Sequence, residues 1–477
     1  MDSTNVEDIT VFGLHDQQSV SLRLRPGLNV VHGKNGTGKT TLLHVLANLA
    51  ERDVERFCYL RFDRIVVTTL AGASIVLRQL REGHDVRIAV TVDGAELETV
   101  TRGAETPLAV SKLLAERLGG RPVYLPAFRA VLEAVSTRRN AYHRLSPHEE
   151  ESVKSLAQKE AHREQEEAAL DGPTSNWTRR FSRERSMTIA YKTLWCRQLF
   201  GAFVPVVRCP SLSEVSEQIA EEIRSAQLNL AAVDRRGAAE VFVNVLTAVV
   251  SATKVASVEE SVETLLGRIR KRLVQLSDSP IPTTQYASLS ELVNDQASSF
   301  EEMATVGRIL HVYDQALAQR LVAQEAIFRR IKTFEGSVNQ FLEGKQLDIA
   351  AGDNDDRWIV SLGPSPVRRR APLSVLSSGE RQVLTLLFSA THMSAADGIL
   401  LIDEPELSMH LDWQRGLLRE LMRQAGARQV VVCTHAPELM ADHRDATSRL
   451  GAEPWILSTD GLANEELRTG DDSEDAE

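Results

Sequence analysis

The chain has 477 residues, of which 43% are hydrophobic and 25% are charged, and it carries a net charge of −11 with 4 cysteines. This length predicts two or three domain-sized units with a large core. The acidic balance excludes a general attraction to nucleic acid, and no apolar run is long enough to span a bilayer. The cysteines are scattered without metal-like spacing, so we expect a cytoplasmic protein with no membrane partner.

The first part of the chain predicts an antiparallel sheet. Strand-forming stretches lie at residues 9–12, 20–24, 64–68, 74–77 and 86–92. The last of them ends at Asp93-Gly94, a pair typical of a two-residue hairpin turn. Residues 123–129 predict another strand that ends in a turn. Arg129 has two open interpretations there, a contact with a nucleotide or partner, or a structural salt bridge.

A complete Gly-x-x-x-x-Gly-Lys-Thr phosphate loop occupies residues 33–40. The apolar residues 28–31 predict a buried strand before it, and residues 41–46 predict a helix after it. In this context the glycines let backbone N–H groups turn toward a polyphosphate, and the helix N-terminus adds partial positive charge. Lys39 is expected to reach the β- and γ-phosphates of a bound polyphosphate, and Thr40 to hold Mg²⁺. The predicted nucleotide-binding residues of the loop are Asn35, Gly36, Thr37, Gly38, Lys39, Thr40 and Thr41.

Between residues 136 and 345 the strand patterns give way to helical spacing of apolar residues. Residues 146–171 are strongly charged and predict either a solvated helix or a mobile segment. Residues 177–185 mix arginines with aromatic residues, and a second basic cluster lies at residues 268–272. Each cluster is either a contact for a phosphate backbone or, as we favour, a helix face paired with acidic neighbours. From residue 289 to about 342, long helices are expected without the sustained heptads of a coiled coil.

A second phosphate-binding segment is predicted at residues 376–382, where small hydroxyl-bearing residues precede an apolar helix. Further on, the continuous apolar run at 399–402 predicts a central strand that is covered on both faces. Asp403 and Glu404 follow this strand directly. Asp403 is positioned to bind Mg²⁺, and Glu404 to orient or deprotonate an attacking water molecule.

A last buried strand is predicted at residues 429–433, and it delivers Thr434 and His435 to the same sheet edge. Two interpretations of His435 stay open. The side chain contacts a γ-phosphate and senses its loss, or it is a loop histidine that caps the next helix.

These four motifs resemble the ABC-type ATPase head of the SMC/RecF/OLD-like branch. Residues 403–414 are especially similar to PtuA, the ATPase subunit of Septu and related retron phage-defence systems. The resemblance implies an α/β head with a mixed central sheet and a flanking antiparallel sheet, interrupted by a large helical insert. The expected divisions are an N-terminal ATPase lobe (1–135), a helical insert (136–345), a C-terminal ATPase lobe (346–460) and an acidic tail (461–477).

The resemblance also implies that two heads form a homodimer that sandwiches ATP and Mg²⁺. Ser377 and Gly379 of one chain then contact the γ-phosphate held by the other chain. Glu404 and His435 are the implied catalytic residues, and Thr40 and Asp403 are the implied ligands of the metal. Two features depart from the pattern. The segment that corresponds to the signature, residues 376–380, ends in Gly379-Glu380 where transporters have Gly-Gln, and no Q-loop glutamine is evident.

The leading hypothesis is an ATPase that regulates a separate effector, such as an HNH nuclease, in anti-phage defence. It follows from a full set of head motifs with little chain after His435 to hold a fused nuclease. The alternative is a RecF- or SMC-like repair or DNA-end-sensing ATPase that binds DNA or RNA. A third hypothesis is a scaffold that binds ATP without turnover, and the long insert argues against a transporter ATPase.

Overall fold

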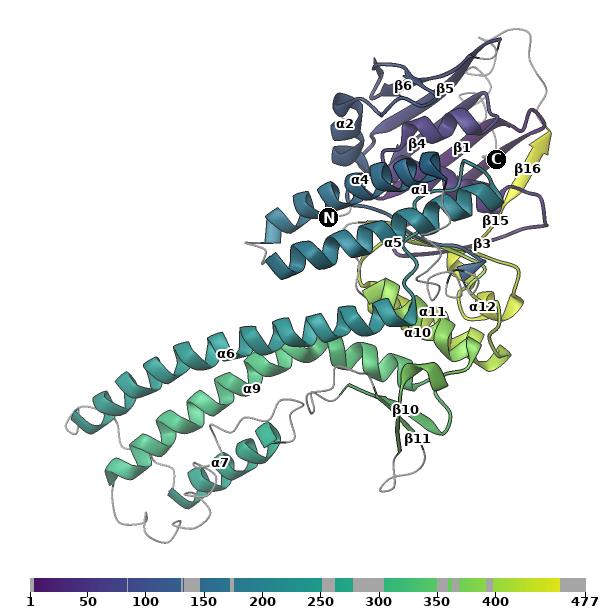
Figure 1. The fold of residues 1–477 in the computed structure, drawn as a ribbon. Helices are drawn as coiled ribbons and strands as arrows, with labels where there is room; N and C mark the ends of the chain where they lie inside the picture. The colour runs from purple at the N-terminus through teal and green to yellow at the C-terminus, as the bar shows by residue number, and fades with distance from the viewer. Residues whose placement is uncertain are drawn as a thin grey trace, which may run out of the picture. The chain divides into compact units, whose positions relative to one another are not determined.

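The computed structural model describes residues 4–83, 85–129, 132, 146–171, 176–250, 262–277, 304–349, 359–362, 369–391 and 398–454 (Figure 1). The chain divides into two compact units: Met1–Cys209 with His392–Glu477, and Pro210–Thr391. These boundaries differ from the expected ones at 135 and 345. Residues 136–209 of the predicted insert group with the first unit, and residues 346–391 of the predicted C-terminal lobe group with the second. The predicted acidic tail lies outside the described residues, as do most side chains of the basic stretch 177–185.

A five-stranded sheet forms the centre of the first unit. In spatial order its strands are β15 (Thr447–Arg449), β3 (Leu28–His32), β14 (Val430–Thr434), β13 (Leu400–Asp403) and β9 (Val123–Leu125). All four pairings are parallel. Every residue of β13 and β14 is buried, as continuous apolar runs predict for strands covered on both faces. The carboxyl ends of β3, β13 and β14 therefore meet at one edge of the sheet.

The flanking sheet of the first unit is antiparallel. Its strands are β16 (Gly451–Pro454), β2 (Gln18–Arg23), β1 (Val6–Leu14), β4 (Arg64–Thr69), β5 (Ser74–Glu82), β6 (Asp85–Val92), β7 (Ala95–Glu96) and β8 (Val100–Thr101). The predicted hairpin joins β6 to β7, and Asp93 and Gly94 have φ of 52° and 81°, as a type I′ turn requires. The α/β class with a flanking antiparallel sheet is confirmed. The described central strands pair only in parallel, however, rather than in the mixed pattern expected.

Helices cover the sheets of the first unit. They are α1 (Lys39–Ala50), α2 (Leu108–Leu118), α4 (Pro147–Asp171), α5 (Asn176–Phe200), α11 (Leu411–Ala425) and α12 (Pro437–Ala441), with the 3₁₀ turns η2 (Val54–Tyr59) and η7 (Arg444–Ala446). Helices α4 and α5 lie side by side as a hairpin (Figure 1), around Val153, Ala157 and Ala190. Of the two interpretations of residues 146–171, the helix is confirmed.

A buried ionic cluster ties this hairpin to the end of α1. The Arg208 guanidinium binds Glu51, which follows α1, and lies 3.0 Å from Glu160 on α4. Arg121, before β9, lies 3.4 Å from the same Glu160. Burial opposes the charge of Arg208, but the carboxylates of Glu160 and Glu51 outweigh burial and raise its pKa. Loss of one partner would leave a buried charge uncompensated, so the cluster fixes the hairpin on the first unit.

The second unit is built on long helices. They are α6 (Leu212–Val250), α7 (Val262–Ser277), α9 (Ala304–Asn339) and α10 (Ser378–Thr391), with the strands β10 (Lys345–Asp348), β11 (Ile359–Leu362) and β12 (Arg369–Ala371) and the turn η6 (Leu373–Val375). Helices α6 and α9 lie side by side (Figure 1) and are joined by the ion pair of Arg320 with Asp234. Among the described residues, no helix is both long and apolar enough to cross a membrane.

One predicted basic cluster is resolved on α7. Arg268 and Arg272 both pair with Asp314 of α9, with Arg268 Nε 3.4 Å from Asp314 Oδ2. Leu265, Ile269 and their apolar neighbours pack into the same contact. For these two arginines, the interpretation as a helix face with an acidic neighbour is confirmed.

Candidate nucleotide-binding site

The predicted phosphate loop runs from the end of β3 into the start of α1, as the sequence indicates. Gly36 and Gly38 have φ of 80° and 89°, a left-handed conformation that strains residues with a side chain. A Cβ at Gly38 would also lie only 3.1 Å from the Leu14 side chain. Asn35 and Gly36 are exposed, and the first N–H groups of a helix have no acceptor within it. The loop therefore offers backbone donors to an anion.

Lys39 is the first residue of α1, and its side chain folds back along the loop. Its residue is 7% exposed, and Nζ donates to the carbonyl oxygens of Gly33 (2.9 Å) and Lys34 (3.1 Å). Thr37 Oγ1 donates to the Lys34 carbonyl as well, over 2.9 Å. Thr41 is half-buried one residue beyond Thr40. The ammonium is thus held at the loop that is expected to receive the phosphates.

The first contact between distant motifs joins the start of α1 to the end of β13. Thr40 Oγ1 donates to Asp403 Oδ2 over 2.9 Å. Asp403 is only 4% exposed, and burial raises its pKa from 3.8 to about 6, although the Thr40 hydrogen bond opposes this shift. An ionised carboxylate in this position is costly by itself, so it gains much from a nearby cation.

The same two groups fit a magnesium site. A hydroxyl and a carboxylate are the hard oxygen ligands that Mg²⁺ prefers, and Mg²⁺ usually takes its other ligands from phosphates and water. The described residues contain no group of three or more His, Cys, Asp or Glu side chains that suits a metal ion. Thr40 and Asp403 supply two oxygen ligands of the kind that Mg²⁺ binds together with phosphate and water.

Glu404 follows β13 in a strained conformation. Its φ of 45° is left-handed, which costs a residue with a side chain about 1–3 kcal/mol and persists only where the surroundings impose it. The Glu404 N–H donates to the Cys433 carbonyl of β14 over 2.8 Å. Its Oε1 lies 3.8 Å from His435 Nε2, and the two side chains are 33% and 37% exposed. The structure therefore brings the two predicted catalytic residues together at a solvent-accessible edge.

Glu406 is a residue that the sequence analysis missed. Its Oε1 accepts hydrogen bonds from Thr434 Oγ1 (2.6 Å), the His435 N–H (2.9 Å) and the Ala436 N–H (3.2 Å). This carboxylate fixes the segment that carries His435. The only signal in the sequence is a third acidic residue after the strand, and that signal does not show where the side chain points.

His435 does not cap the following helix. The residue that flanks α12 at its N-terminal end is Ala436, and its N–H donates to Glu406 Oε1 and Thr434 Oγ1 rather than to the His435 side chain. The helix-cap interpretation is therefore wrong, whereas the predicted contact with a γ-phosphate stays a prediction.

Arg129 follows β9 and is 4% exposed. Its Nη1 donates to the carbonyls of Pro126 (3.1 Å) and Asp403 (3.0 Å), and its Nη2 donates to those of Glu404 (3.0 Å) and Pro405 (2.9 Å). Burial lowers the pKa of this guanidinium. The sequence suggested a nucleotide or partner contact or a salt bridge, but the guanidinium binds four backbone carbonyls instead.

The second predicted phosphate-binding segment belongs to the second unit, at the start of α10. The Ser377 N–H donates to Glu380 Oε2 (2.6 Å), and Ser377 Oγ accepts from the Glu380 N–H (3.4 Å), which is a capping box. Lys345 Nζ lies 2.7 Å from the same Oε2. Burial opposes ionisation of Glu380, but the bonds from Lys345 and Ser377 outweigh it and lower its pKa. The glutamate that departs from the transporter pattern thus closes this helix start, leaving Ser377 exposed and Gly379 buried.

Comparison with known families identifies one match. A family model described as "AAA domain, putative AbiEii toxin, Type IV TA system" matches residues 258–441, which is less than half of the chain. This range includes the signature, Asp403, Glu404 and His435, but not the phosphate loop. A comparison with curated proteins finds no match.

Solved structures of SMC heads are also similar to this chain. One is the Smc head domain with an extended coiled coil bound to the C-terminal domain of ScpA from Pyrococcus furiosus, with 11% identity, a TM-score of 0.37 and coverage of 94% of this chain and 96% of that chain. Another is the SmcHead bound to the C-winged helix domain of ScpA, with 9% identity, a TM-score of 0.39 and coverage of 94% and 98%.

Proposed function

We propose that this protein is an ATPase that hydrolyses ATP to ADP and phosphate with Mg²⁺. The observation that carries the proposal is the 2.9 Å bond between Thr40 and Asp403, which joins the phosphate loop to the end of β13. Glu404 and His435 lie at the ends of the same strand and its neighbour. A phosphate cradle, a pair of metal-binding oxygens and a carboxylate at one sheet edge are the parts that phosphoryl transfer to water requires.

Each side chain has a stated task in this reaction. The loop N–H groups and Lys39 bind the β- and γ-phosphates, and Thr40 and Asp403 hold the metal ion. A Mg²⁺ ion held by these two residues would supply positive charge that stabilises the phosphates during transfer. Glu404 orients the attacking water and accepts its proton as the new bond to the γ-phosphorus forms and ADP leaves. His435 donates a hydrogen bond to the γ-phosphate.

We further propose that two copies of the chain pair around ATP. Ser377 and Gly379 lie at the N-terminal end of α10, where the helix dipole favours a phosphate. Ser377 is exposed, so its hydroxyl is accessible to a nucleotide that the other copy holds. The homodimer then contains two composite sites, each completed by the partner.

Regulation of a separate effector in anti-phage defence is the biological role we propose. The similarity of residues 403–414 to PtuA of Septu systems supports it, and the matched family description names a toxin of a toxin–antitoxin system. The effector would be a nuclease such as an HNH protein, and the protein would act in the cytoplasm. Affinity purification of the natively expressed protein should recover a nuclease encoded beside it. Purification of the ATPase alone, with no nuclease gene adjacent, would contradict this role.

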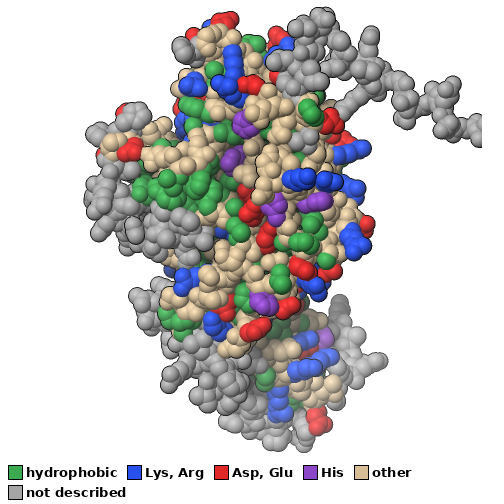
Figure 2. All heavy atoms as spheres, turned by 90° about the vertical axis from the view of Figure 1, so that its right-hand side faces the viewer, with side chains coloured by type: hydrophobic (Ala, Val, Ile, Leu, Met, Phe, Trp, Pro, Cys, Tyr) green, Lys and Arg blue, Asp and Glu red, His purple; other side chains and the backbone are tan. Residues whose placement is uncertain are grey.

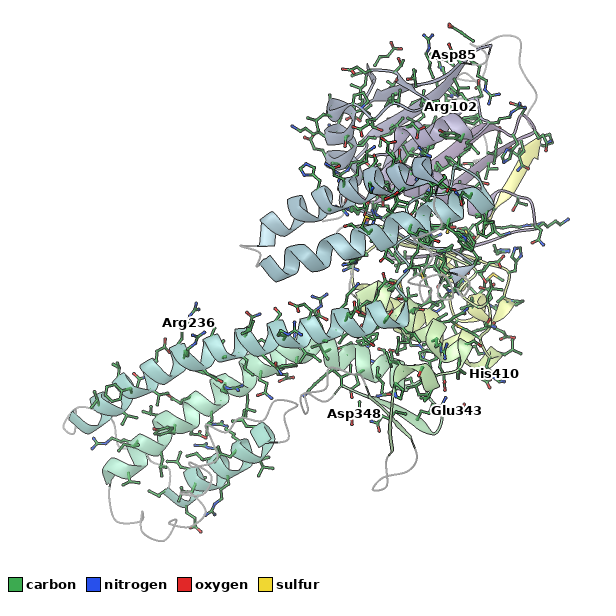
Figure 3. All side chains as sticks on the ribbon, viewed as in Figure 1. Asp85, Arg102, Arg236, Glu343, Asp348 and His410 are labelled. Atoms are coloured by element: carbon green, nitrogen blue, oxygen red, sulfur yellow. The ribbon has the colours of Figure 1, made fainter. Side chains whose placement is uncertain are left out.

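Nucleic-acid binding is the second candidate, and exposed basic residues of the second unit favour it. Arg235 and Arg236 on α6 and Arg270 and Lys271 on α7 are exposed, and Arg236 projects away from its helix (Figure 3). Figure 2 shows Lys and Arg side chains interspersed with Asp and Glu on one face, so binding would depend on such local clusters. DNA binding that weakens steeply with salt and is lost on charge reversal at Arg270 and Lys271 would support this candidate, and salt-independent binding would contradict it.

Nucleotide binding is the first test of the proposed ATPase. The Lys39→Ala variant removes the ammonium from the loop, so we expect ATP affinity and turnover to fall by at least about 10-fold. Lys112→Ala on α2 is the matched control, because Lys112 is exposed and distant in sequence from every motif. Equal ATP binding and equal turnover by both variants would contradict the proposed site.

A further inference from the structure

We propose that Arg129 is a positioning residue for the Walker B loop, which we define as residues 403–406, and that it links this loop to the α4–α5 hairpin. The inference rests on the proposed ATPase function and names how that site is regulated. It has three independent supports: the bonds of the guanidinium, the backbone of Glu404, and a ring contact of the residue beside Arg129.

The bonding of Arg129 is unusual for a buried cation. Its four hydrogen bonds of 2.9–3.1 Å all go to backbone carbonyls, and three of these belong to consecutive residues of the Walker B loop. Carbonyl dipoles replace the carboxylate that usually accompanies a buried arginine. Such a set of acceptors requires the planar fork of a guanidinium, because an ammonium has three donors around one atom. The side chain therefore serves to fix the direction of these carbonyls.

The fixed carbonyls determine the conformation of Glu404. Its N–H is bonded to the Cys433 carbonyl and its C=O to Arg129, so the peptide groups on both sides of its Cα are held. Between them the residue adopts its left-handed φ of 45°. A residue with a side chain leaves this conformation when the surroundings release it. Arg129 thus sets where the Glu404 carboxylate lies relative to His435.

The neighbouring residue connects this device to the hairpin. The rings of Phe128 and Phe200 stack with centroids 4.0 Å apart and an interplanar angle of 20°. Phe200 is the last residue of α5 and is 50% exposed. A displacement of the end of the hairpin therefore reaches Phe128 directly and Arg129 through one peptide bond.

The first test replaces Arg129 with lysine, which keeps the charge and removes the fork. We expect kcat to fall about 10- to 100-fold while the ATP dissociation constant stays within about 3-fold, because only the geometry of the reacting groups changes. Hydrogen–deuterium exchange of peptides that cover residues 403–406 should rise in the variant without nucleotide. Unchanged exchange in this loop would overturn the inference even if no hydrolysis were observed, and unchanged kcat in an active enzyme would overturn it as well.

The second test avoids the buried core. Phe200→Ala removes the stacked ring at an exposed position, and Leu199→Ala, at a neighbouring residue that is 57% exposed, is the matched control. Loss of the stack should lower kcat about 2- to 10-fold and raise exchange at residues 403–406, while the control behaves as wild type. Equal behaviour of the two variants would refute the link to the hairpin. If the wild type hydrolyses ATP and the Arg129→Lys and Phe200→Ala variants do so equally fast, only this inference is refuted. If the wild type does not hydrolyse ATP, the proposed function is refuted.

Discussion

At the scale of single residues, Asp403 combines two opposing requirements. Its place at the end of a fully buried strand puts the carboxylate where it can hold a metal ion beside Thr40. The same burial raises its pKa to about 6, so the ionised form destabilises the protein without a cation. Stability and the proposed metal binding therefore oppose each other at this position.

Asp403→Asn should stabilise the nucleotide-free protein. A carboxyl with a folded pKa raised from 3.8 to about 6 binds more protons in the folded state, so its contribution to stability falls as pH rises through this window. Above about pH 7 the amide should therefore gain about 1–3 kcal/mol in the free energy of unfolding. Urea unfolding at about pH 7.5 and pH 4 measures this, with the gain vanishing at the lower value. If the variant is destabilised equally at both pH values, burial of the ionised Asp403 carboxylate does not lower the stability of the wild type.

Several residues of the proposed site were predictable from the sequence because their signal is local. Lys39, Thr40, Asp403 and His435 each follow an apolar strand or open a helix, and parallel strands bring their ends to one edge. Glu406 and Arg129 carry no such signal. Their roles depend on which backbone groups lie opposite them, and Arg129 meets Glu404 from 275 residues away in sequence.

At the scale of elements, the start of α10 shows how one substitution is accommodated. Glu380 replaces the glutamine of the transporter pattern and receives bonds from the Ser377 backbone and from Lys345 of β10. A carboxylate near a helix N-terminus also interacts favourably with the helix dipole. The sequence predicts the helix start correctly, whereas the partner Lys345 depends on the tertiary fold of the second unit.

Glu380→Ala should lower stability by about 1–2 kcal/mol, because it removes the capping box and leaves Lys345 without its partner. The lowered pKa of Glu380 means that its stabilisation is present above about pH 4.5 and is lost as pH falls through the folded value. Thermal unfolding at neutral pH compares this variant with Glu343→Ala, an exposed glutamate before β10 (Figure 3). Equal melting temperatures for the two variants would show that the capping box of Ser377 and Glu380 does not contribute to stability.

At the scale of the whole molecule, the phosphate loop and the signature segment belong to different compact units. Length alone predicts that a chain of this size forms more than one unit, but not where it divides. The boundary at Cys209 was not predictable, because α5 and α6 are both helical and only their packing assigns them to separate units.

Pairing of two chains around ATP gives a prediction at this scale. Ser377→Arg places a long cation at the exposed N-terminal end of α10 and should abolish ATP-dependent dimers while leaving ATP binding to the phosphate loop within about 3-fold of wild type. The matched control is Ser374→Arg, because Ser374 is exposed and precedes the helix. Thr385→Arg is less suitable, because the Thr385 hydroxyl bonds within α10. Light scattering with and without ATP measures the outcome. Dimers that persist in the Ser377→Arg variant would refute the composite site.

ATP turnover by Glu404→Gln tests the central claim most directly. The amide keeps the size of the side chain but cannot accept the proton of the attacking water, so we predict at least about 100-fold slower hydrolysis with ATP binding retained. Glu438→Gln, which alters an exposed ion pair with Arg415, is the matched control and should hydrolyse ATP at the wild-type rate. If Glu404→Gln and the wild type hydrolyse ATP equally fast, the strand-end carboxylate does not carry the reaction and the proposed mechanism is contradicted.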